Sequence, residues 1–127
     1  MLHRRIEQNP VSGDSLTSNR LNQYQSMWLF VFFDLPTETR KERKIPTDFR
    51  KTLLQNGFEM FQFSIYIWFC NSREQADNKS LRIKRALPNK GHIAVMRITD
   101  KQFGMIELFH GVKKEALPQV SQQLELF

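Results

Sequence analysis

The feature that most constrains this chain is a run of six bulky apolar residues, Trp28 to Phe33, that stops at Asp34 and Pro36. A short segment that is apolar at every position is typical of a strand covered on both faces, although periodicity alone also allows a buried helical segment. Its brevity and its aromatic and β-branched content favour a strand, which Pro36 would prevent from continuing. Asp34 is therefore predicted at the end of a central strand.

Length, charge and cysteine content narrow the class of protein. The chain has 127 residues, enough for one domain with a single core. Its 19 Lys and Arg against 13 Asp and Glu give a net charge of +6, which favours polyanionic partners, above all nucleic acid. The single cysteine, Cys70, excludes an internal disulfide and fits a reducing cytosol. No stretch approaches the roughly 20 apolar residues of a membrane span, so we expect a cytoplasmic protein with no membrane partner.

Composition divides the chain into three parts. Residues 1–26 are polar, without a sustained apolar period, and are predicted to be a disordered leader. Residues 27–111 carry the apolar patterns of the folded domain. Residues 112–127 form a polar tail whose alternating apolar end could be frayed, or could add as a strand to a sheet edge of the same chain, of a second copy or of a partner. We favour strand addition, which makes interface residues of Leu124, Leu126 and Phe127.

An amphipathic helix is predicted after Pro36. Ile45, Phe49 and Leu53 recur at helical spacing, and Gly57 is placed to end the helix. Pro46 is expected in the first turn of this helix or at a kink after a preliminary turn, because a proline in the middle of a helix costs about 3 kcal/mol.

The segment Phe58 to Cys70 is long enough for a hairpin-like pair or for one bent strand. From Phe61 onward it alternates, which predicts two faces. The core face would hold Phe61, Phe63, Ile65, Ile67 and Phe69. The other face, with Tyr66 and Trp68, is amphipathic and is a candidate partner interface.

The remaining elements complete a recognisable order. Ser72 and Gln75 form a capping-box pattern for a helix in which Ala76, Ile83 and Leu87 point inward. Strands are expected at His92–Ile98 and at Phe103–Phe109. The order predicts an α+β fold, a ferredoxin-like βαββαβ sandwich with an antiparallel sheet, two helices on one face and an extra C-terminal strand.

Basic residues gather in the two predicted helices. For any single Lys or Arg a solvated surface is the better interpretation, but together they exceed what solubility requires and indicate phosphate contacts. No aromatic signature of an RNA-recognition strand is present, so contacts to the nucleic-acid backbone are expected. The candidate nucleic-acid-binding residues are Arg40, Lys41, Arg43, Lys44, Lys79, Arg82 and Arg85.

Several short motifs occur in an order and at a spacing that resemble a known family. They are Phe32-Phe33-Asp34-Leu35-Pro36-Thr37, Glu42-Arg43-Lys44, Phe49-Arg50-Lys51, Asn56-Gly57-Phe58, Gln62-Phe63-Ser64-Ile65-Tyr66, Pro88-Asn89-Lys90-Gly91 and Thr99-Asp100-Lys101-Gln102-Phe103. Together they resemble the small subunit of the CRISPR spacer-acquisition complex, and members from type II systems most closely. The resemblance covers about residues 28–111.

This resemblance implies a homodimer in the prokaryotic cytoplasm that bridges two dimers of the integrase subunit in a heterohexameric complex and holds double-stranded spacer DNA. It also implies a second activity, a Mg²⁺-dependent endonuclease acting on single-stranded RNA. The metal residue carried over from the family is Asp34.

The chemistry of Asp34 leaves two functions open. One carboxylate is a poor Mg²⁺ cage, but a two-fold axis could bring two copies of Asp34 to one hydrated ion, which would polarise a phosphate. Alternatively, Asp34 only caps the turn that follows the strand. The protein is then either an architectural DNA scaffold that does not cut, or a metal nuclease. The charge distribution and the C-terminal tail favour the scaffold, and only Asp34 supports the enzyme.

Overall fold

The computed structural model describes residues 26–120; residues 1–25 and 121–127 lie outside the described part of the chain. All of the predicted leader except Ser26 falls outside this range. So do the predicted interface residues Leu124, Leu126 and Phe127. The leader and the strand addition therefore stay predictions.

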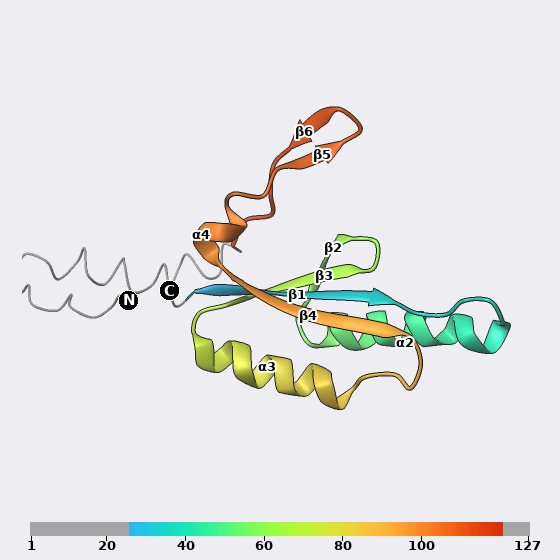
Figure 1. Ribbon diagram of the computed structural model, residues 1–127. Coiled ribbons are helices and arrows are strands. Elements are labelled where there is room, and N and C mark those ends of the chain that lie inside the picture. The colour runs from blue at the N-terminus through green and yellow to red at the C-terminus, as the bar shows by residue number, and fades with distance from the viewer. Residues whose placement is uncertain (1–25, 121–127) are drawn as a thin grey trace, which may run out of the picture.

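The described residues form a four-stranded antiparallel sheet in the order β2-β3-β1-β4. At its centre, β1 (Met27–Asp34) pairs with β3 (Ile65–Cys70) on one side and with β4 (His92–Thr99) on the other, and β2 (Glu59–Gln62) is an edge strand. Helices α2 (Arg40–Gln55) and α3 (Arg73–Arg85) lie on one face of this sheet (Figure 1). This is the predicted α+β ferredoxin-like βαββαβ plan.

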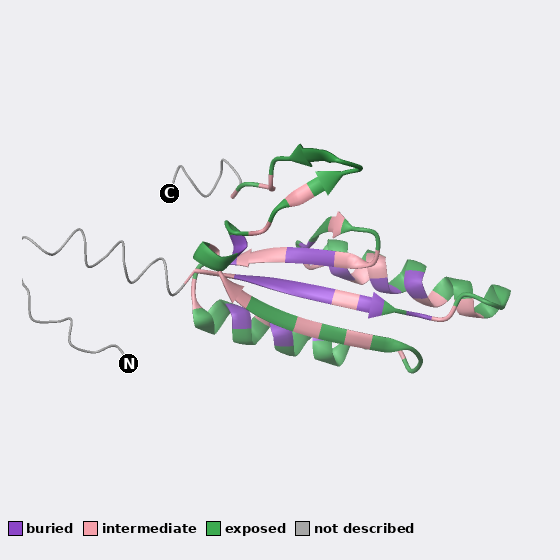
Figure 2. Ribbon diagram, turned by 45° about the horizontal axis from the view of Figure 1, so that its top comes forward, coloured by how far each residue is buried: buried purple, intermediate pink, exposed green. Residues whose placement is uncertain are grey.

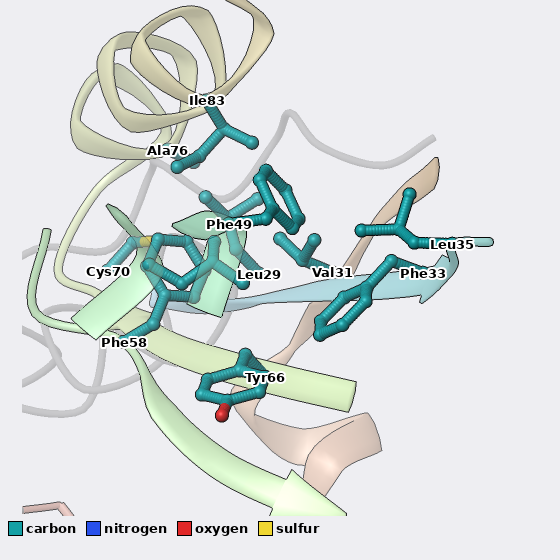
Figure 3. Close-up of a cluster of buried hydrophobic side chains, with 11 residues drawn as sticks. Leu29, Val31, Phe33, Leu35, Phe49, Phe58, Tyr66, Cys70, Ala76 and Ile83 are labelled. Carbon is teal, nitrogen blue, oxygen red and sulfur yellow. The ribbon is translucent and has the colours of Figure 1, made fainter. Parts of the chain in front are cut away.

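Strand β1 is covered on both faces, as its sequence predicts, and Figure 2 shows it buried along most of its length. One face contributes to a helix-side cluster (Figure 3), whose buried members are Leu29, Val31, Phe33, Leu35, Phe49, Leu53, Phe58, Tyr66, Cys70, Ala76 and Ile83. The opposite face contributes to an outer-face cluster of Trp28, Phe30, Ile67 and Phe103. Alternate residues of a strand point to opposite faces, so an all-apolar strand needs two such cores.

Helix α2 starts at a complete capping box. The Thr39 hydroxyl accepts from the Glu42 N–H, and the Glu42 carboxylate accepts from the Thr39 N–H. Pro46 lies inside this helix, beyond its first turn. Of its two expected places the first turn is therefore wrong, and the place after a preliminary turn agrees with the structure. The proline ring is buried, which offsets part of the cost of the missing N–H.

The end of α2 agrees with its sequence. Gly57 has φ +87°, and its N–H donates to the Leu54 carbonyl at 3.0 Å. The Phe58 N–H donates to the Leu53 carbonyl at 3.0 Å. These two bonds make a Schellman motif, in which glycine takes the left-handed position without strain.

A tight turn separates β2 from β3 and corrects the predicted faces. Phe63 lies in this turn and is 77% exposed, and Ser64 has φ +70°, so Phe63 is not a core residue. Tyr66 is buried on the helix side, and Trp68 is half-buried against the same cluster. The predicted exposed interface at Tyr66 and Trp68 is therefore wrong. Side chains on both faces of β3 are buried or half-buried, so the polarity of its residues does not distinguish the two faces.

Helix α3 begins where predicted. The Ser72 hydroxyl accepts from the Gln75 N–H, while the Gln75 side chain reaches back to the Asn71 N–H at 2.8 Å. Ala76 and Ile83 are fully buried, but Leu87 lies past the end of the helix and is exposed, so its predicted inward position is wrong. In the part of the chain that the structure describes, no helix has the length and apolar character to cross a membrane.

The segment after β4 is a one-turn helix, α4 (Asp100–Phe103), rather than the start of a strand. Phe103 stacks on Trp28 with ring centroids 3.9 Å apart and an interplanar angle of 11°. The indole N–H of Trp28 donates to Asp100 Oδ1 at 2.8 Å. These contacts fasten α4 to the outer face of the sheet.

A separate hairpin replaces the predicted strand Phe103–Phe109. It pairs β5 (Leu108–His110) with β6 (Lys113–Glu115) around Gly111, and it projects away from the main sheet (Figure 1). The expected extra C-terminal strand is thus a two-stranded element of its own.

Candidate nucleic-acid and metal site

Asp34 lies at the last position of β1, exposed, opposite His92 on β4. The neighbouring Phe33 N–H donates to the Ser64 carbonyl at 3.0 Å, which holds the strand to the β2–β3 turn. The backbone of Gly91 packs directly against this point, because an ideal Cβ on Gly91 would lie 2.8 Å from the Asp34 carbonyl oxygen. The carboxylate of Asp34 therefore projects from a fixed strand end.

Thr39 supplies the side-chain acceptor at the start of α2. Asp34 lies before this cap and is exposed at the end of β1. The alternative interpretation of Asp34 as a cap of the adjacent turn stays a prediction.

One copy of the chain does not supply a complete metal cage. Within residues 26–120 no group of three or more His, Cys, Asp or Glu side chains could hold an ion. Mg²⁺ prefers octahedral oxygen ligands and usually retains several waters. Asp34 therefore fits one ligand of a largely hydrated Mg²⁺ ion, and further protein ligands would have to come from a second copy.

Most of the predicted basic residues lie at the same end of the molecule as Asp34. The start of α2, the end of α3 and the end of β1 lie toward the same end of the molecule (Figure 1). The exposed cations are Arg40, Lys41, Arg43, Lys44, Arg82 and Arg85. Arg43 is held in place by its Nη1, which donates to the carbonyls of Thr37 and Glu38, each at 3.3 Å. We call this end of the molecule the cationic end.

A groove of about 620 Å³ opens between α2 and the loop before β4. Lys41 and Lys90 line it, and Lys90 Nζ lies 3.6 Å from a Glu42 carboxylate oxygen. The carboxylates of Glu42 and Asp48 also line the groove, so its lining carries both signs of charge.

Lys79 does not belong to this surface. Its Nζ donates to the Asn56 carbonyl at 2.8 Å and lies 4.3 Å from the centroid of the Trp68 ring. Burial, reinforced by the charge of Arg82, lowers the pKa of the Lys79 ammonium. Lys79 therefore caps the end of α2 and lies apart from the other candidate nucleic-acid-binding residues.

Two features of the site were missed from the sequence. The sequence gives no sign that position 91 requires a glycine, but the structure shows that a side chain there would meet the backbone of β1. The sequence predicts Phe63 in the core, yet its ring is exposed and the guanidinium carbon of Arg50 lies 4.4 Å from its centroid. The spacing of Arg50 and Phe63 in the sequence gives no sign of this contact.

Fold and geometry together define a class: a small ferredoxin-like protein with an exposed strand-end carboxylate beside a cluster of cations. A family model described as CRISPR associated protein Cas2 matches residues 27–106. The chain belongs to the Cas2 family, which confirms the resemblance drawn from its motifs.

Three known relatives are similar to this chain over nearly their full length. A protein of Flavobacterium psychrophilum named CRISPR-associated endoribonuclease Cas2 is 66% identical over 108 residues, which cover 85% of this chain and 94% of that protein. Proteins with the same name from Paracidovorax avenae and Parvibaculum lavamentivorans are 41% and 43% identical, covering 84% and 80% of this chain and 99% and 100% of those proteins.

Proposed function

We propose that this protein is the architectural subunit of CRISPR spacer acquisition in the prokaryotic cytoplasm. In this proposal a homodimer bridges two dimers of the integrase subunit and holds double-stranded spacer DNA by its backbone. Membership of the Cas2 family and the CRISPR names of the relatives support the biological process. The single observation that carries DNA binding is the cationic end, where α2 and α3 bring exposed cations together.

The outer face of the sheet supports dimerisation. Helices α2 and α3 cover only the opposite face, and α4 covers only part of the outer one. Apolar side chains remain half-buried around the outer-face cluster, among them Phe32, Phe61, Ile65 and Phe69. A second copy packed on this face would remove the remaining apolar surface from water.

Replacing Arg82 and Arg85 together by Gln tests the DNA-binding role. If both contact phosphate, binding of the full chain to unrelated duplexes should weaken to a similar degree. The slope of log affinity against log salt should also fall by up to about 0.9 per lost contact. Binding is measured by fluorescence anisotropy from low to physiological salt.

The matched control replaces Arg73 and Lys101 by Gln. This removes the same two charges at the opposite end of the molecule, at the start of α3 and in α4. An equal loss in both double variants would mean that net charge, not the cationic end, governs binding.

A second candidate function is a Mg²⁺-dependent endoribonuclease. The relatives carry that activity in their names, and Asp34 offers an exposed carboxylate at a fixed strand end. A bound Mg²⁺ would supply charge neutralisation at a phosphate and an activated water. Asp34 would contribute one oxygen ligand from each copy of the dimer, next to cations that hold the substrate backbone.

A further inference from the structure

His92 lies directly opposite Asp34 in the sheet, where the end of β1 pairs with the start of β4 (Figure 1). The two residues are partners in the antiparallel register, and both are exposed. Side chains of directly opposed residues project from the same face of a sheet, with Cβ atoms about 4.5–5.5 Å apart. An imidazole therefore stands beside the carboxylate that is the candidate metal ligand.

Both side chains belong to the outer face of the sheet. Phe32, two positions before Asp34, packs against the outer-face cluster, and alternate residues of a strand share a face. Ile93, next to His92, packs against the helix-side cluster, so His92 is on the outer face by the same rule. A second copy packed on this face, as proposed above, would bring a second carboxylate and a second imidazole to the same surface.

The backbone on either side of the pair is held in place. The Phe33 N–H donates to the Ser64 carbonyl at 3.0 Å, which fixes the end of β1 to the β2–β3 turn. Gly91 approaches so closely that a Cβ there would lie 2.8 Å from the Asp34 carbonyl oxygen, which fixes the start of β4 against β1. Ligands on fixed strand ends need little ordering to bind an ion.

The pair combines ligand atoms that different metals prefer. Mg²⁺ takes oxygen ligands and usually keeps several waters, whereas imidazole nitrogen is a common ligand of first-row transition metals. A metal ion holds nitrogen and carboxylate oxygen at about 2.1 Å, so it needs both side chains from neighbouring positions, as the register provides. The exposed cations of the cationic end repel a dication, and a bond to nitrogen adds affinity where charge alone gives little.

We propose that Asp34 and His92 together form a mixed oxygen and nitrogen site for a divalent first-row transition-metal ion, which the protein binds in preference to Mg²⁺. This proposal rests on the second candidate function, in which Asp34 holds a metal ion. It adds His92 as a second ligand and names the class of ion.

The test measures the binding of Co²⁺ and of Mg²⁺ to the full chain, without a histidine tag, by isothermal titration calorimetry. Proton NMR follows the imidazole signals, which a bound paramagnetic Co²⁺ shifts and broadens. The variants are His92→Ala and Asp34→Asn. The matched control is His110→Ala, because the His110 Nδ1 lies 3.6 Å from a Glu115 carboxylate oxygen and so forms another imidazole and carboxylate pair. Circular dichroism and thermal midpoints establish that each variant is folded.

The unchanged protein should bind Co²⁺ at least about tenfold more tightly than Mg²⁺. His92→Ala should weaken Co²⁺ binding at least about tenfold and Mg²⁺ binding by less than about twofold, because water replaces the imidazole on Mg²⁺. Asp34→Asn should weaken the binding of both ions, and His110→Ala should leave the Co²⁺ preference unchanged. The imidazole signals that disappear in His92→Ala should be the first that Co²⁺ shifts.

Three outcomes would overturn the proposal. If Asp34→Asn loses Co²⁺ binding and His92→Ala keeps it, Asp34 remains a metal ligand and the role of His92 fails. If the unchanged protein binds Mg²⁺ as tightly as Co²⁺, the preference for a transition metal fails. If neither Asp34→Asn nor His92→Ala changes the affinity for either ion, the metal role of Asp34 in the second candidate function fails together with this site.

Discussion

Replacing Gly91 with alanine should destabilise the end of the sheet that carries Asp34. Gly91 has φ +89°, and a Cβ there would lie 2.5 Å from Leu35 Cδ2 and 2.8 Å from the Asp34 carbonyl oxygen. The leucine methyl group can rotate away. The carbonyl belongs to the backbone of β1, so the added atom can be accommodated only if β1 and the start of β4 move apart.

The expected cost has two parts. A non-glycine residue in the left-handed region costs about 1–2 kcal/mol. Forcing an extra carbon into a packed site typically costs about 1–3 kcal/mol more. Together they predict a loss of about 2–5 kcal/mol in the free energy of unfolding. For a domain of this size, 1 kcal/mol lowers the thermal midpoint by about 4–8 °C.

Gly57→Ala is the matched control. Gly57 has φ +87°, so it carries the same backbone strain, but the nearest atom to its Cβ would be the indole Nε1 of Trp68 at 3.1 Å, in a side chain that can move. Urea unfolding followed by tryptophan fluorescence measures both variants. If Gly91→Ala is destabilised no more than Gly57→Ala, the contact with the Asp34 carbonyl has no energetic weight and the reasoning is refuted.

Two further predictions concern Asp34 and Cys70. The Asp34→Asn variant should stay folded and dimeric and should still support spacer integration with the integrase. Any Mg²⁺-dependent cleavage should disappear in this variant, because Asn lacks the charge that holds the ion. Asp48→Asn on α2 should keep both activities, and loss of integration together with cleavage in Asp34→Asn would overturn the scaffold proposal. Burial raises the pKa of the Cys70 thiol from 9.0 to about 12, so an aromatic disulfide reagent at pH 8 should label it only in denaturant. Equal labelling rates with and without denaturant would contradict the burial of this thiol. Because the pKa of the thiol is higher in the folded protein than in the unfolded chain, the contribution of Cys70 to stability is complete below about pH 9 and is lost progressively toward pH 12.

The order of elements could be predicted because several local signals agree with the fold. The all-apolar β1, the helical spacing of Phe49 and Leu53, and Gly57 after α2 each specify their element through short-range chemistry. The predicted strand starting at Phe103 failed although a signal was present: Thr99 and Gln102 have the same capping-box spacing as Ser72 and Gln75. The same pattern therefore marks a helix start in both places.

The side chains around the candidate site were harder to predict because tertiary contacts decide them. The residues next to Lys79 in the sequence are typical of an exposed lysine. Its ammonium points inward because α3 brings it to the Asn56 carbonyl at the end of α2. Phe63 was expected in the core but is exposed, and Tyr66 was expected on the amphipathic face but is buried. A turn interrupts the alternation that the sequence suggests. Asp34 was predicted correctly at a strand end, because Pro36 shortly after the apolar run marks where the strand stops.

The central position of β1 has a consequence for synthesis of the protein. It is the first strand of the domain to leave the ribosome, yet its partners come much later, with Met27 opposite Cys70 in β3 and opposite Thr99 in β4. Until β4 has emerged, one edge of β1 has no partner and its aromatic side chains lack part of their cover. The nascent chain therefore carries its most aggregation-prone segment unprotected for most of its translation, and a pause between β3 and β4 would lengthen that exposure.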